Sequence, residues 1–493
     1  MMINIADLME TSGVKFGTSG ARGLVCDMTD RVCFTYTLAF LHHVLASGSV
    51  KQGGKVAVAG DYRPSTPRIM EAVGLAIQQA GFVPVHCGFV PTPALAAYAM
   101  ARHMPCIMVT GSHIPDDRNG IKFYKPEGEI LKDDEQSMCS RSVEFDMTLF
   151  DANGQKTCDV VWAEKNQDAY TEFVARYTRF LPQDCLKGQR VGVYEHSSVA
   201  REVLADIIKG LGADVVLLGR SDTFIPVDTE AVREEDVELA KAWADEYQLD
   251  CIISADGDGD RPLVSDEHGV WLRGDVLGIV CARQLGAAHV VTPVSCNSAV
   301  EKSGYFASVH RTRIGSPFVI EVMNALLKAG KTQVVGYEAN GGFFTASDIE
   351  VGGRTLTALP TRDAVIAPLM LLLAAKDKGL TVSKLIQTLP PRFTASGRLQ
   401  GVPTEASWQH IASLRQDKAW FEQQYGEVVH IDEMDGFRMT FKSDVVIHLR
   451  PSGNAPELRC YVEAASAEQA EDILRQCLTH LESWVASSKH HGC

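Results

Sequence analysis

The 493-residue sequence lacks any CxxC pair, although it contains 13 cysteines. The missing pair argues against the common cysteine-based zinc and redox sites, and the odd count argues against a disulfide framework. Cys26, Cys87, Cys106, Cys251 and Cys281 stand among apolar neighbours. This pattern is typical of small buried hydrophobic residues in a reducing compartment.

Long apolar runs are absent as well. The run Leu369–Ala375 is too short to cross a bilayer, and it stops at Lys376. Residues 1–13 lack the apolar segment that a secretory signal peptide needs. We therefore expect a cytoplasmic protein without a membrane partner.

Positive charge is scarce: 47 Lys and Arg stand against 62 Asp and Glu, which gives a formal net charge of -15. This balance argues against a general binder of nucleic acid or membrane surfaces. The hydrophobic content of 45% and the charged content of 22% are globular values. The length predicts roughly three or four domains.

An order of strand, helix and strand recurs along the chain, and it predicts βαβ units with mainly parallel pairing. The three copies fall at 55–61, 67–79 and 81–85, at 190–194, 200–211 and 213–218, and more weakly at 289–294, 298–304 and 306–309. From about residue 393 the pattern changes to short strands at 439–441, 445–449 and 458–462 and a closing helix at 467–481. The sequence therefore predicts an α/β protein with three similar α/β domains and a smaller C-terminal α+β domain.

Each copy then reaches a further strand that ends in an unusual loop. These loops are Thr110–Pro115, Asp256–Arg261 and Gly336–Gly342. If the copies are equivalent domains, the three loops occupy equivalent places in them. If the loops also face one cleft, together they form a composite site.

The first loop contains Ser112, which follows a short apolar strand at 106–109 and precedes a turn signal at Asn119-Gly120 and a second strand at 121–124. A serine in this place can carry a phosphoryl group or act as a nucleophile, with charge supplied by His113 and Lys122. The alternative is an ordinary capping serine in a turn.

The second loop carries Asp256, Asp258 and Asp260 at alternate positions with glycines between them. Three carboxylates that converge suit a hard cation such as Mg²⁺ or Ca²⁺. An EF-hand loop would need glycine at its sixth place, where this chain has Arg261, so we reject it although Glu267 fits the twelfth place. A solvated acidic turn is the other alternative, and Arg261 can approach a phosphate that the metal also touches.

Three further loops suit a phosphorylated sugar. The glycine-rich loop Lys15–Gly23 presents Arg22 to an oxyanion, unless it is only a flexible entry loop. Glu338 suits sugar hydroxyls, unless it is a turn carboxylate. Arg450, Ser452 and Asn454 suit a phosphate, although taken alone this loop is more often structural. A phosphorylated sugar is the ligand class that uses all of these loops together.

On these residues the chain resembles the α-D-phosphohexomutase superfamily, and the resemblance spans nearly its whole length. Four signature loops occur in the family's order: Lys15–Gly23 is similar to the opening loop, Thr110–Pro115 to the phosphoserine loop, Asp256–Arg261 to the metal loop and Arg450–Pro456 to the phosphate loop. The stretch Arg313–Ser316 resembles the loop that helps choose sugar orientation, with serine where some dual-specificity members have histidine.

The departures from the family pattern are confined to a few positions. Gly111 and Ile114 replace alanine and asparagine around the serine, and Asn340 replaces a serine after Glu338. Asn454 and Ala455 replace threonine and glutamate in the phosphate loop. The Ser-His pair and the three aspartates are kept, so we expect the family's chemistry.

The resemblance implies four domains around a central cleft, which we place at 1–160, 161–268, 269–388 and 389–493. It implies transfer of phosphate between O1 and O6 of a hexose through phosphorylated Ser112 and a hexose 1,6-bisphosphate, which also serves as activator. One Mg²⁺ per chain would be held by Ser112, Asp256, Asp258 and Asp260. The implied catalytic group is Ser112, His113, Lys122 and Arg22. The implied substrate-binding residues are Arg261, Glu338, Asn340, Arg450, Ser452, Gly453, Asn454 and Arg459.

Overall likeness to bacterial members of polysaccharide pathways favours phosphomannomutase activity, which supplies mannose 1-phosphate for GDP-mannose. Phosphoglucomutase and phosphoglucosamine mutase are the next alternatives, ahead of a metal-dependent sugar phosphatase or an inactive sugar-phosphate-binding protein. We expect a hexose phosphate substrate as partner, a chain that is a monomer or a homodimer, and no nucleic-acid partner.

Overall fold

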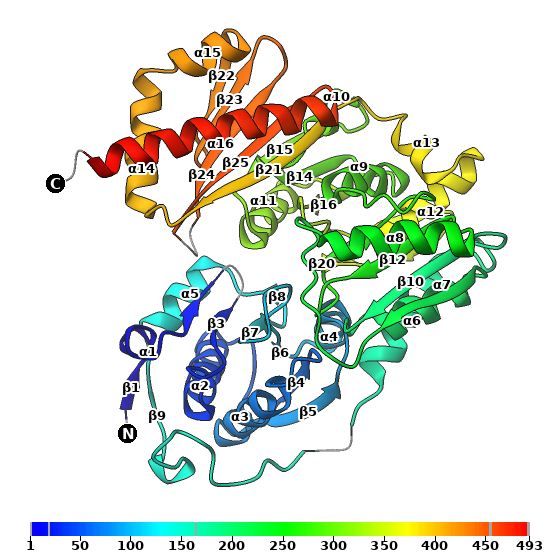
Figure 1. The fold of residues 1–493 in the computed structure, drawn as a ribbon. Coiled ribbons are helices and arrows are strands. Elements are labelled where there is room, and N and C mark those ends of the chain that lie inside the picture. The colour runs from blue at the N-terminus through cyan, green and yellow to red at the C-terminus, as the bar shows by residue number, and fades with distance from the viewer. Residues whose placement is uncertain (1, 18–19, 163–164, 453–455, 491–493) are drawn as a thin grey trace. The chain divides into compact units, whose positions relative to one another are not determined.

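The computed structural model describes residues 2–17, 20–162, 165–452 and 456–490 (Figure 1). The chain forms two compact units. Unit 1 comprises residues 1–291 and 315–386, and unit 2 comprises residues 292–314 and 387–493.

The first sheet of unit 1 is mixed. Its strands are β2 (Lys15–Phe16), β3 (Ala21–Leu24), β4 (Lys55–Gly60), β5 (Val83–Gly88), β6 (Cys106–Val109), β7 (Arg118–Lys125) and β8 (Gly128–Glu129). They lie in the order β2-β3-β7-β6-β4-β5, with β8 beside β7. The central β4 is parallel to β5 and β6, whereas β6, β7 and β3 are antiparallel to one another in turn.

Helices cover this first sheet because its central strands are apolar on both faces. These helices are α2 (Asp30–Ala46), α3 (Thr66–Gln79) and α4 (Thr92–Met100). α2 and α3 pack on one another, and α3 and α4 both pack against β4. Thr29 caps α2 by accepting the amide of Val32.

The second sheet repeats this plan. Its strands are β10 (Arg190–His196), β11 (Asp214–Arg220), β12 (Cys251–Ala255) and β13 (Pro262–Val264), and its helices are α6 (Asp168–Phe180), α7 (Arg201–Gly210) and α8 (Glu234–Tyr247). The strand order is β11-β10-β12-β13. β10 is parallel to both neighbours, and β13 is antiparallel to β12.

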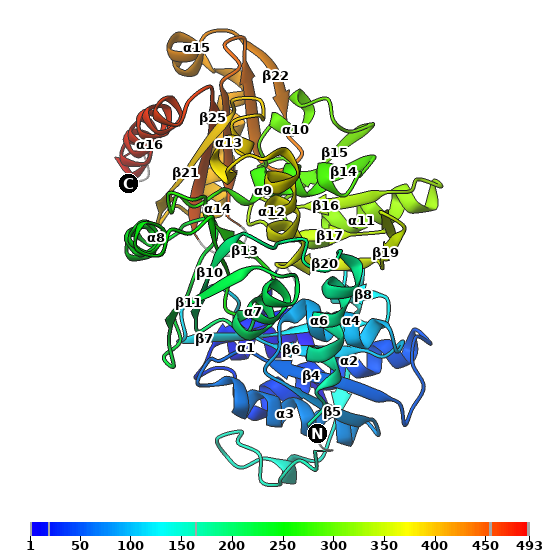
Figure 2. The ribbon, with the colours of Figure 1, turned by 90° about the vertical axis from the view of Figure 1, so that its right-hand side faces the viewer.

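The third sheet has the same core. Its strands in unit 1 are β14 (His289–Pro293), β16 (Val334–Tyr337), β17 (Phe343–Thr345) and β20 (Leu359–Asp363), and its helices are α9 (Gly274–Gln284), α11 (Ser316–Lys328) and α12 (Ile366–Lys378). β14 is parallel to β16, which is antiparallel to β17. α9 and α12 lie side by side in both views (Figures 1 and 2).

The repeat predicted from the sequence is thus confirmed. In each copy a parallel strand (β6, β12 or β16) runs into the predicted loop, and the chain returns as an antiparallel neighbour. One local prediction was wrong: Asn119 and Gly120 lie inside β7 and form no turn. The turn falls earlier, between the end of β6 and Arg118.

Unit 2 contains the predicted α+β domain. Its sheet strands are β21 (Phe393–Gln400), β22 (Val428–Asp432), β23 (Phe437–Phe441), β24 (Val446–Pro451) and β25 (Glu457–Ala464), and its helices are α14 (Thr404–Gln416), α15 (Ala419–Tyr425) and α16 (Ala467–His490). The sheet is antiparallel, in the order β21-β25-β24-β23-β22. Unit 2 also includes α10 (Ala299–Lys302) and β15 (Ser308–Thr312) from the segment 292–314.

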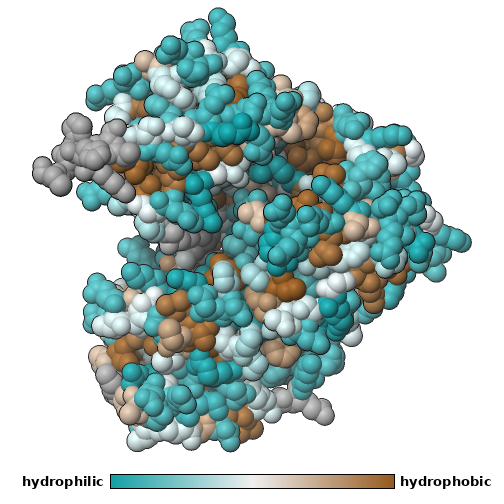
Figure 3. Space-filling view, in the orientation of Figure 1, coloured by the Kyte–Doolittle hydropathy of each residue, from teal (hydrophilic) through white to brown (hydrophobic). Residues whose placement is uncertain are grey.

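The surface that Figure 3 presents is mostly hydrophilic, and its hydrophobic residues lie in separate patches. Among the described helices, none has the length and apolar content needed to cross a membrane.

Candidate active site

The loop that carries Ser112 is held by a buried ion pair. Ser112 has a left-handed backbone with φ of 58° and is buried. Arg63 donates from Nη2 to the Ser112 carbonyl at 2.9 Å and from Nη1 to the Pro115 carbonyl at 2.6 Å, and Asp61 accepts from Arg63 Nε at 3.1 Å. A Cβ at Gly111 would lie 2.6 Å from Arg63 Cζ. The Arg63 guanidinium therefore occupies the space that a side chain at position 111 would need.

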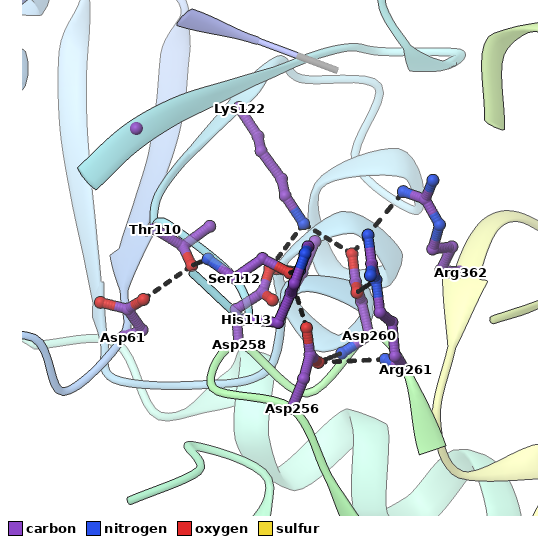
Figure 4. A network of polar contacts seen from close by, with 12 residues as sticks. Asp61, Thr110, Ser112, His113, Lys122, Asp256, Asp258, Asp260, Arg261 and Arg362 are labelled. Carbon is purple, nitrogen blue, oxygen red and sulfur yellow. Dashed lines mark hydrogen bonds and ion pairs between the residues drawn. The ribbon is translucent and has the colours of Figure 1, made fainter. Parts of the chain in front are cut away.

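Thr110 connects this ion pair to the serine. Its hydroxyl donates to Asp61 Oδ2 at 2.7 Å and accepts the Ser112 amide at 2.7 Å (Figure 4). Thr110 thus holds the amide of Ser112 and Arg63 holds its carbonyl, so the strained backbone is fixed. This keeps the Ser112 hydroxyl in one place.

The three aspartates follow β12 and converge. Asp256 Oδ1 accepts the backbone amides of Asp260 and Arg261, both at 3.1 Å, so the loop curls around this carboxylate. One oxygen of each of the three carboxylates lies within 4.8 Å of the others, and all three residues are buried. Asp258 Oδ1 and Asp260 Oδ1 are buried without a hydrogen-bond partner among the described residues. Buried carboxylate oxygens that lack a donor are the groups a divalent cation would satisfy, so the residues fit a hard cation.

The serine and aspartate loops meet directly. Ser112 Oγ donates to Asp256 Oδ2 at 2.6 Å. Lys122 from β7 donates from Nζ to Asp258 Oδ2 and to Asp260 Oδ2, each at 2.6 Å (Figure 4). Thr92, at the start of α4, also donates to Asp258 Oδ2 at 2.6 Å.

The close carboxylates have perturbed pKa values. Burial first, and then the charges of Asp258 and Asp260, raise the pKa of Asp256 well above its ordinary value. Burial acts in the same direction on Asp258, but Lys122 and Thr92 outweigh it and lower the pKa of Asp258. Neighbouring carboxylates in a buried site thus have opposite pKa shifts, because Lys122 contacts Asp258 and Asp260 but not Asp256.

Several basic groups border these loops. Burial, followed by repulsion from Arg261, lowers the pKa of Arg22 to about 10. Burial and then the charges of Arg261 and Arg22 lower the pKa of His113 well below its ordinary value. His113 Nδ1 lies 3.3 Å from Ser112 Oγ. The structure thus gathers the four residues predicted as catalytic next to the aspartates.

The loop after β16 is linked to the same cluster by Arg362. Glu338 is buried and accepts from Arg362 Nε at 2.5 Å, while Arg362 Nη1 lies 3.9 Å from Asp260 Oδ2. Asn340 Oδ1 accepts the amide of Gly342 at 2.9 Å, so the amide side chain shapes its own loop.

Ser316 is buried at the start of α11 and donates to Glu129 Oε2 at 2.8 Å. Thr361 donates to the other oxygen of Glu129 at 2.7 Å. The Ser316 hydroxyl therefore donates its hydrogen bond to a carboxylate of the protein itself.

The predicted phosphate loop lies in unit 2. Arg450 donates from Nε to Asp435 Oδ1 at 2.8 Å, and the amide of the buried Ser452 donates to the Glu457 carbonyl at 2.8 Å. Arg459 Nη2 lies 3.6 Å from Glu457 Oε2. Gly453 and Asn454, also predicted to bind substrate, lie outside the described residues.

Sequence reasoning missed four residues of the site. Asp61 and Arg63 follow the first strand of the repeat, so their place at a strand end was a usable signal. Thr92 and Arg362 gave no local signal, because their roles depend on contacts with residues 166 and 24 positions away.

Four domain families match the chain in order. They are described as phosphoglucomutase/phosphomannomutase alpha/beta/alpha domain I at residues 13–145, domain II at 168–269, domain III at 273–393 and C-terminal domain at 402–479. The domain boundaries predicted from the sequence stay predictions.

Full-length relatives show the same likeness. The phosphomannomutase of Salmonella muenchen is 46% identical over 484 residues, which cover 97% of this chain and 98% of the relative. That of Sinorhizobium fredii is 43% identical and covers 96% of this chain and 99% of its own length. A crystal structure of a phosphoglucomutase/phosphomannomutase family protein from Burkholderia thailandensis has the same fold, with a TM-score of 0.72, 22% identity and coverage of 94% of this chain and 97% of that one.

Proposed function

The chain belongs to the phosphoglucomutase/phosphomannomutase family, and from this we propose that it is a phosphomannomutase. It would interconvert mannose 6-phosphate and mannose 1-phosphate as an intramolecular phosphotransferase of the isomerase class. The observation that carries the proposal is the 2.6 Å contact between Ser112 Oγ and Asp256 in a chain 46% identical to a phosphomannomutase. Supply of GDP-mannose for polysaccharide synthesis stays a prediction.

Ser112 is the proposed phosphoryl carrier. Its phosphorylated hydroxyl donates the group to the free hydroxyl of a hexose phosphate, which forms a hexose 1,6-bisphosphate. The other phosphate of this intermediate then returns to Ser112, so the sugar leaves with its phosphate moved. The anchoring of the Ser112 loop by Arg63 and Thr110 supports this role, because in-line transfer requires a fixed carrier oxygen.

Asp256, Asp258 and Asp260, with an oxygen on Ser112, are the residues that would hold a divalent cation, for which we propose Mg²⁺. When bound, the cation supplies charge neutralisation to the transferring phosphoryl group. The unpartnered oxygens of Asp258 and Asp260 support this assignment.

The cations around the serine have a separate role in the proposal. Lys122 holds two of the aspartates and places a positive charge beside the carrier oxygen. Arg22 and Arg261 add fixed positive charge for the phosphoryl oxygens, and His113 is placed to exchange a proton at the reacting oxygen.

The remaining residues are proposed to bind the sugar phosphate. Glu338 and Asn340 would accept or donate hydrogen bonds to sugar hydroxyls. Arg450, Ser452, Gly453, Asn454 and Arg459 would hold the phosphate that is not reacting. Hexose 1,6-bisphosphate, as the activator, would reload Ser112 whenever its phosphate is lost.

The test is a side-by-side assay of the purified chain with mannose, glucose and glucosamine phosphates in both directions, with Mg²⁺ and hexose 1,6-bisphosphate. We expect kcat/KM to be highest for the mannose phosphates. A higher value for glucose or glucosamine phosphate would replace the assignment by another activity of the family. Release of inorganic phosphate in place of isomerised product would indicate a phosphatase.

A further inference from the structure

Unit 2 contains a pocket of about 380 Å³ that lies wholly within this unit. Its polar lining includes Lys302, Arg311, Arg392, Arg438, Asp432 and Asp444. The volume is in the range that holds small molecules in proteins. None of the residues predicted to bind phosphate from Arg450 to Arg459 contributes to its lining.

Three of the four cations in the pocket have anionic partners. Arg311 pairs with both carboxylate oxygens of Glu301, at 2.7 and 2.8 Å. Arg392 pairs with Glu463 at 2.5 Å, and Lys302 pairs with Asp444 at 3.2 Å.

Arg438 differs from these three. Within the described part of the chain its side chain forms no ion pair, and the one hydrogen bond of that side chain is a long contact of 3.4 Å from Nη1 to Thr440 Oγ1. Asp432 is its cross-strand neighbour on β22, yet the two groups are not within ion-pair distance. Burial, and then the charge of Arg311, lower the pKa of Arg438. The carboxylates of Glu463, Asp432 and Glu301 act on Arg438 only from beyond ion-pair distance. A half-buried guanidinium that lies in no ion pair gains free energy when an anion binds close to it.

We propose that this pocket binds a small molecule that bears a phosphate group, and that Arg438 is its main anion-binding residue. Arginine suits this role because its planar fork donates two parallel hydrogen bonds to phosphate oxygens. Asp432 and Thr440 add acceptors beside it, which suit hydroxyl groups on the same ligand. This pocket is a second site, in addition to the proposed substrate site.

The pocket joins two segments of the chain that are distant in sequence. Its walls come from 292–314 and from 387–493, and Asn297 Nδ2 donates to the Arg392 carbonyl at 2.7 Å between them. A ligand that contacts both walls binds only the folded unit, so it stabilises unit 2 by mass action.

Tungstate is a suitable probe, because it mimics phosphate and can be located by anomalous diffraction. Crystals of the full chain soaked in tungstate should show an anomalous peak beside Arg438. The peak should be lost in Arg438→Gln and kept in the matched control Arg475→Gln, which removes an exposed arginine of the same unit. No peak in the pocket of the wild type, or an equal peak in Arg438→Gln, would overturn the proposal.

A second variant covers the case in which Arg438→Gln fails to fold. Lys302→Gln changes a partly exposed side chain and should lower the peak occupancy at subsaturating tungstate. An undiminished occupancy would count against a cationic pocket.

In solution, inorganic phosphate should slow amide exchange in 292–302 and 437–441 more than chloride does at equal ionic strength. Its dissociation constant should rise at least about tenfold in Arg438→Gln. Parallel titrations with inorganic phosphate and mannose 6-phosphate separate a bare-phosphate site from a sugar-phosphate site. Equal exchange rates with phosphate and chloride in the wild type would overturn the proposal.

Discussion

Ser112 and Asp256 are 144 positions apart in the sequence, and the serine hydroxyl donates a 2.6 Å hydrogen bond to the aspartate. One residue follows a strand of the first sheet and the other a strand of the second, so equivalent loops of two repeats meet. The carboxylate orients the hydroxyl that we propose to carry phosphate.

Ser112→Ala should abolish mutase turnover and leave the fold intact, because it removes one hydroxyl and leaves the anchoring of the loop by Arg63 unchanged. The measurements are isomerisation rate and intact mass. Wild type should contain a fraction that is heavier by one phosphate, and the variant should not. Ser140→Ala, at an exposed serine, is the control, and retained activity in Ser112→Ala would exclude the phosphoserine mechanism.

Asp258→Asn should raise the Mg²⁺ concentration needed for half-maximal activity by about tenfold or more and should lower kcat more than it raises KM. The reason is that it removes a negative charge from the group that would hold the cation and also weakens the contact to Lys122. An Mg²⁺ titration of the steady-state rate measures the effect. Asp245→Asn on the exposed side of α8 should leave the titration unchanged, whereas an unchanged titration in Asp258→Asn would contradict the three-aspartate site.

The sequence was informative where a signal is local. A short apolar run followed by glycines and polar residues predicted β6 and β12 and the loops after them. The prediction of a turn at Asn119-Gly120 was wrong, because the glycine serves another purpose within β7. A Cβ at Gly120 would lie 2.8 Å from the Thr110 carbonyl oxygen and 2.9 Å from that of Ala21. This glycine permits close approach of β3, of β7 and of Thr110 directly after β6, and it does not form a turn.

Contacts between distant segments could not be predicted from the sequence. The anchoring of the Ser112 loop by Arg63 and the link from Arg362 to Glu338 depend on how the strands are placed in the folded chain. An arginine in the sequence looks the same whether it is solvated or buried against a carboxylate. The charge and glycine context of Ser112, His113 and Lys122 thus predicted residues that lie together in the structure, whereas the side chains that hold their loops in place were not predicted.

Arg362→Ala should lower stability by about 3 kcal/mol, because it leaves Glu338 buried without its counter-ion. The double variant Arg362→Met, Glu338→Gln should recover most of this loss but no activity, since both groups border the proposed sugar site. Thermal unfolding and kcat/KM measure the two effects. Arg415→Ala is the matched control, because it breaks an exposed pair with Glu433 that we expect to contribute less than about 1 kcal/mol.

A stability loss in Arg362→Ala no larger than that in Arg415→Ala would show that the buried pair is not needed for folding. Recovered activity in the double variant would show that Glu338 does not bind substrate.

Arg450→Ala should reduce kcat/KM by about ten- to a hundredfold in both directions, because a charge-assisted contact to the non-reacting phosphate is the same for either orientation of the bisphosphate. Asp435, which accepts from Arg450 Nε and from the Ile314 amide, fixes the direction of this arginine. Rates of the forward and reverse reactions give the measurement, with Arg475→Ala as the control. An effect in one direction only would contradict a shared phosphate site.

His410 is a buried histidine on α14 of unit 2. His410 stacks on Trp484 with ring centroids 3.9 Å apart, and neither of its ring nitrogens has a hydrogen-bond partner among the described residues. Burial, together with His480, lowers the pKa of His410 to about 4. Between this value and its ordinary pKa near 6.5, the unfolded chain binds a proton that the folded chain does not. The free energy of unfolding therefore has its full value above pH 6.5 and falls as the pH drops toward 4.

At pH 5 this difference amounts to about 2 kcal/mol for a single histidine. His410→Phe keeps an aromatic ring beside Trp484 and removes the titrating group, so it should reduce the loss of stability between pH 7 and pH 5 by this amount. Amide exchange in α14 and α16, corrected for the intrinsic rate at each pH, measures local stability in a phosphate-free buffer. His430→Gln, at an exposed histidine on β22 of unit 2, should keep the wild-type dependence on pH. If His410→Phe also kept the wild-type dependence of stability on pH, the acid sensitivity of unit 2 would have to come from other groups. The buried His448 would be the next group to test, because its pKa is also lowered to about 4.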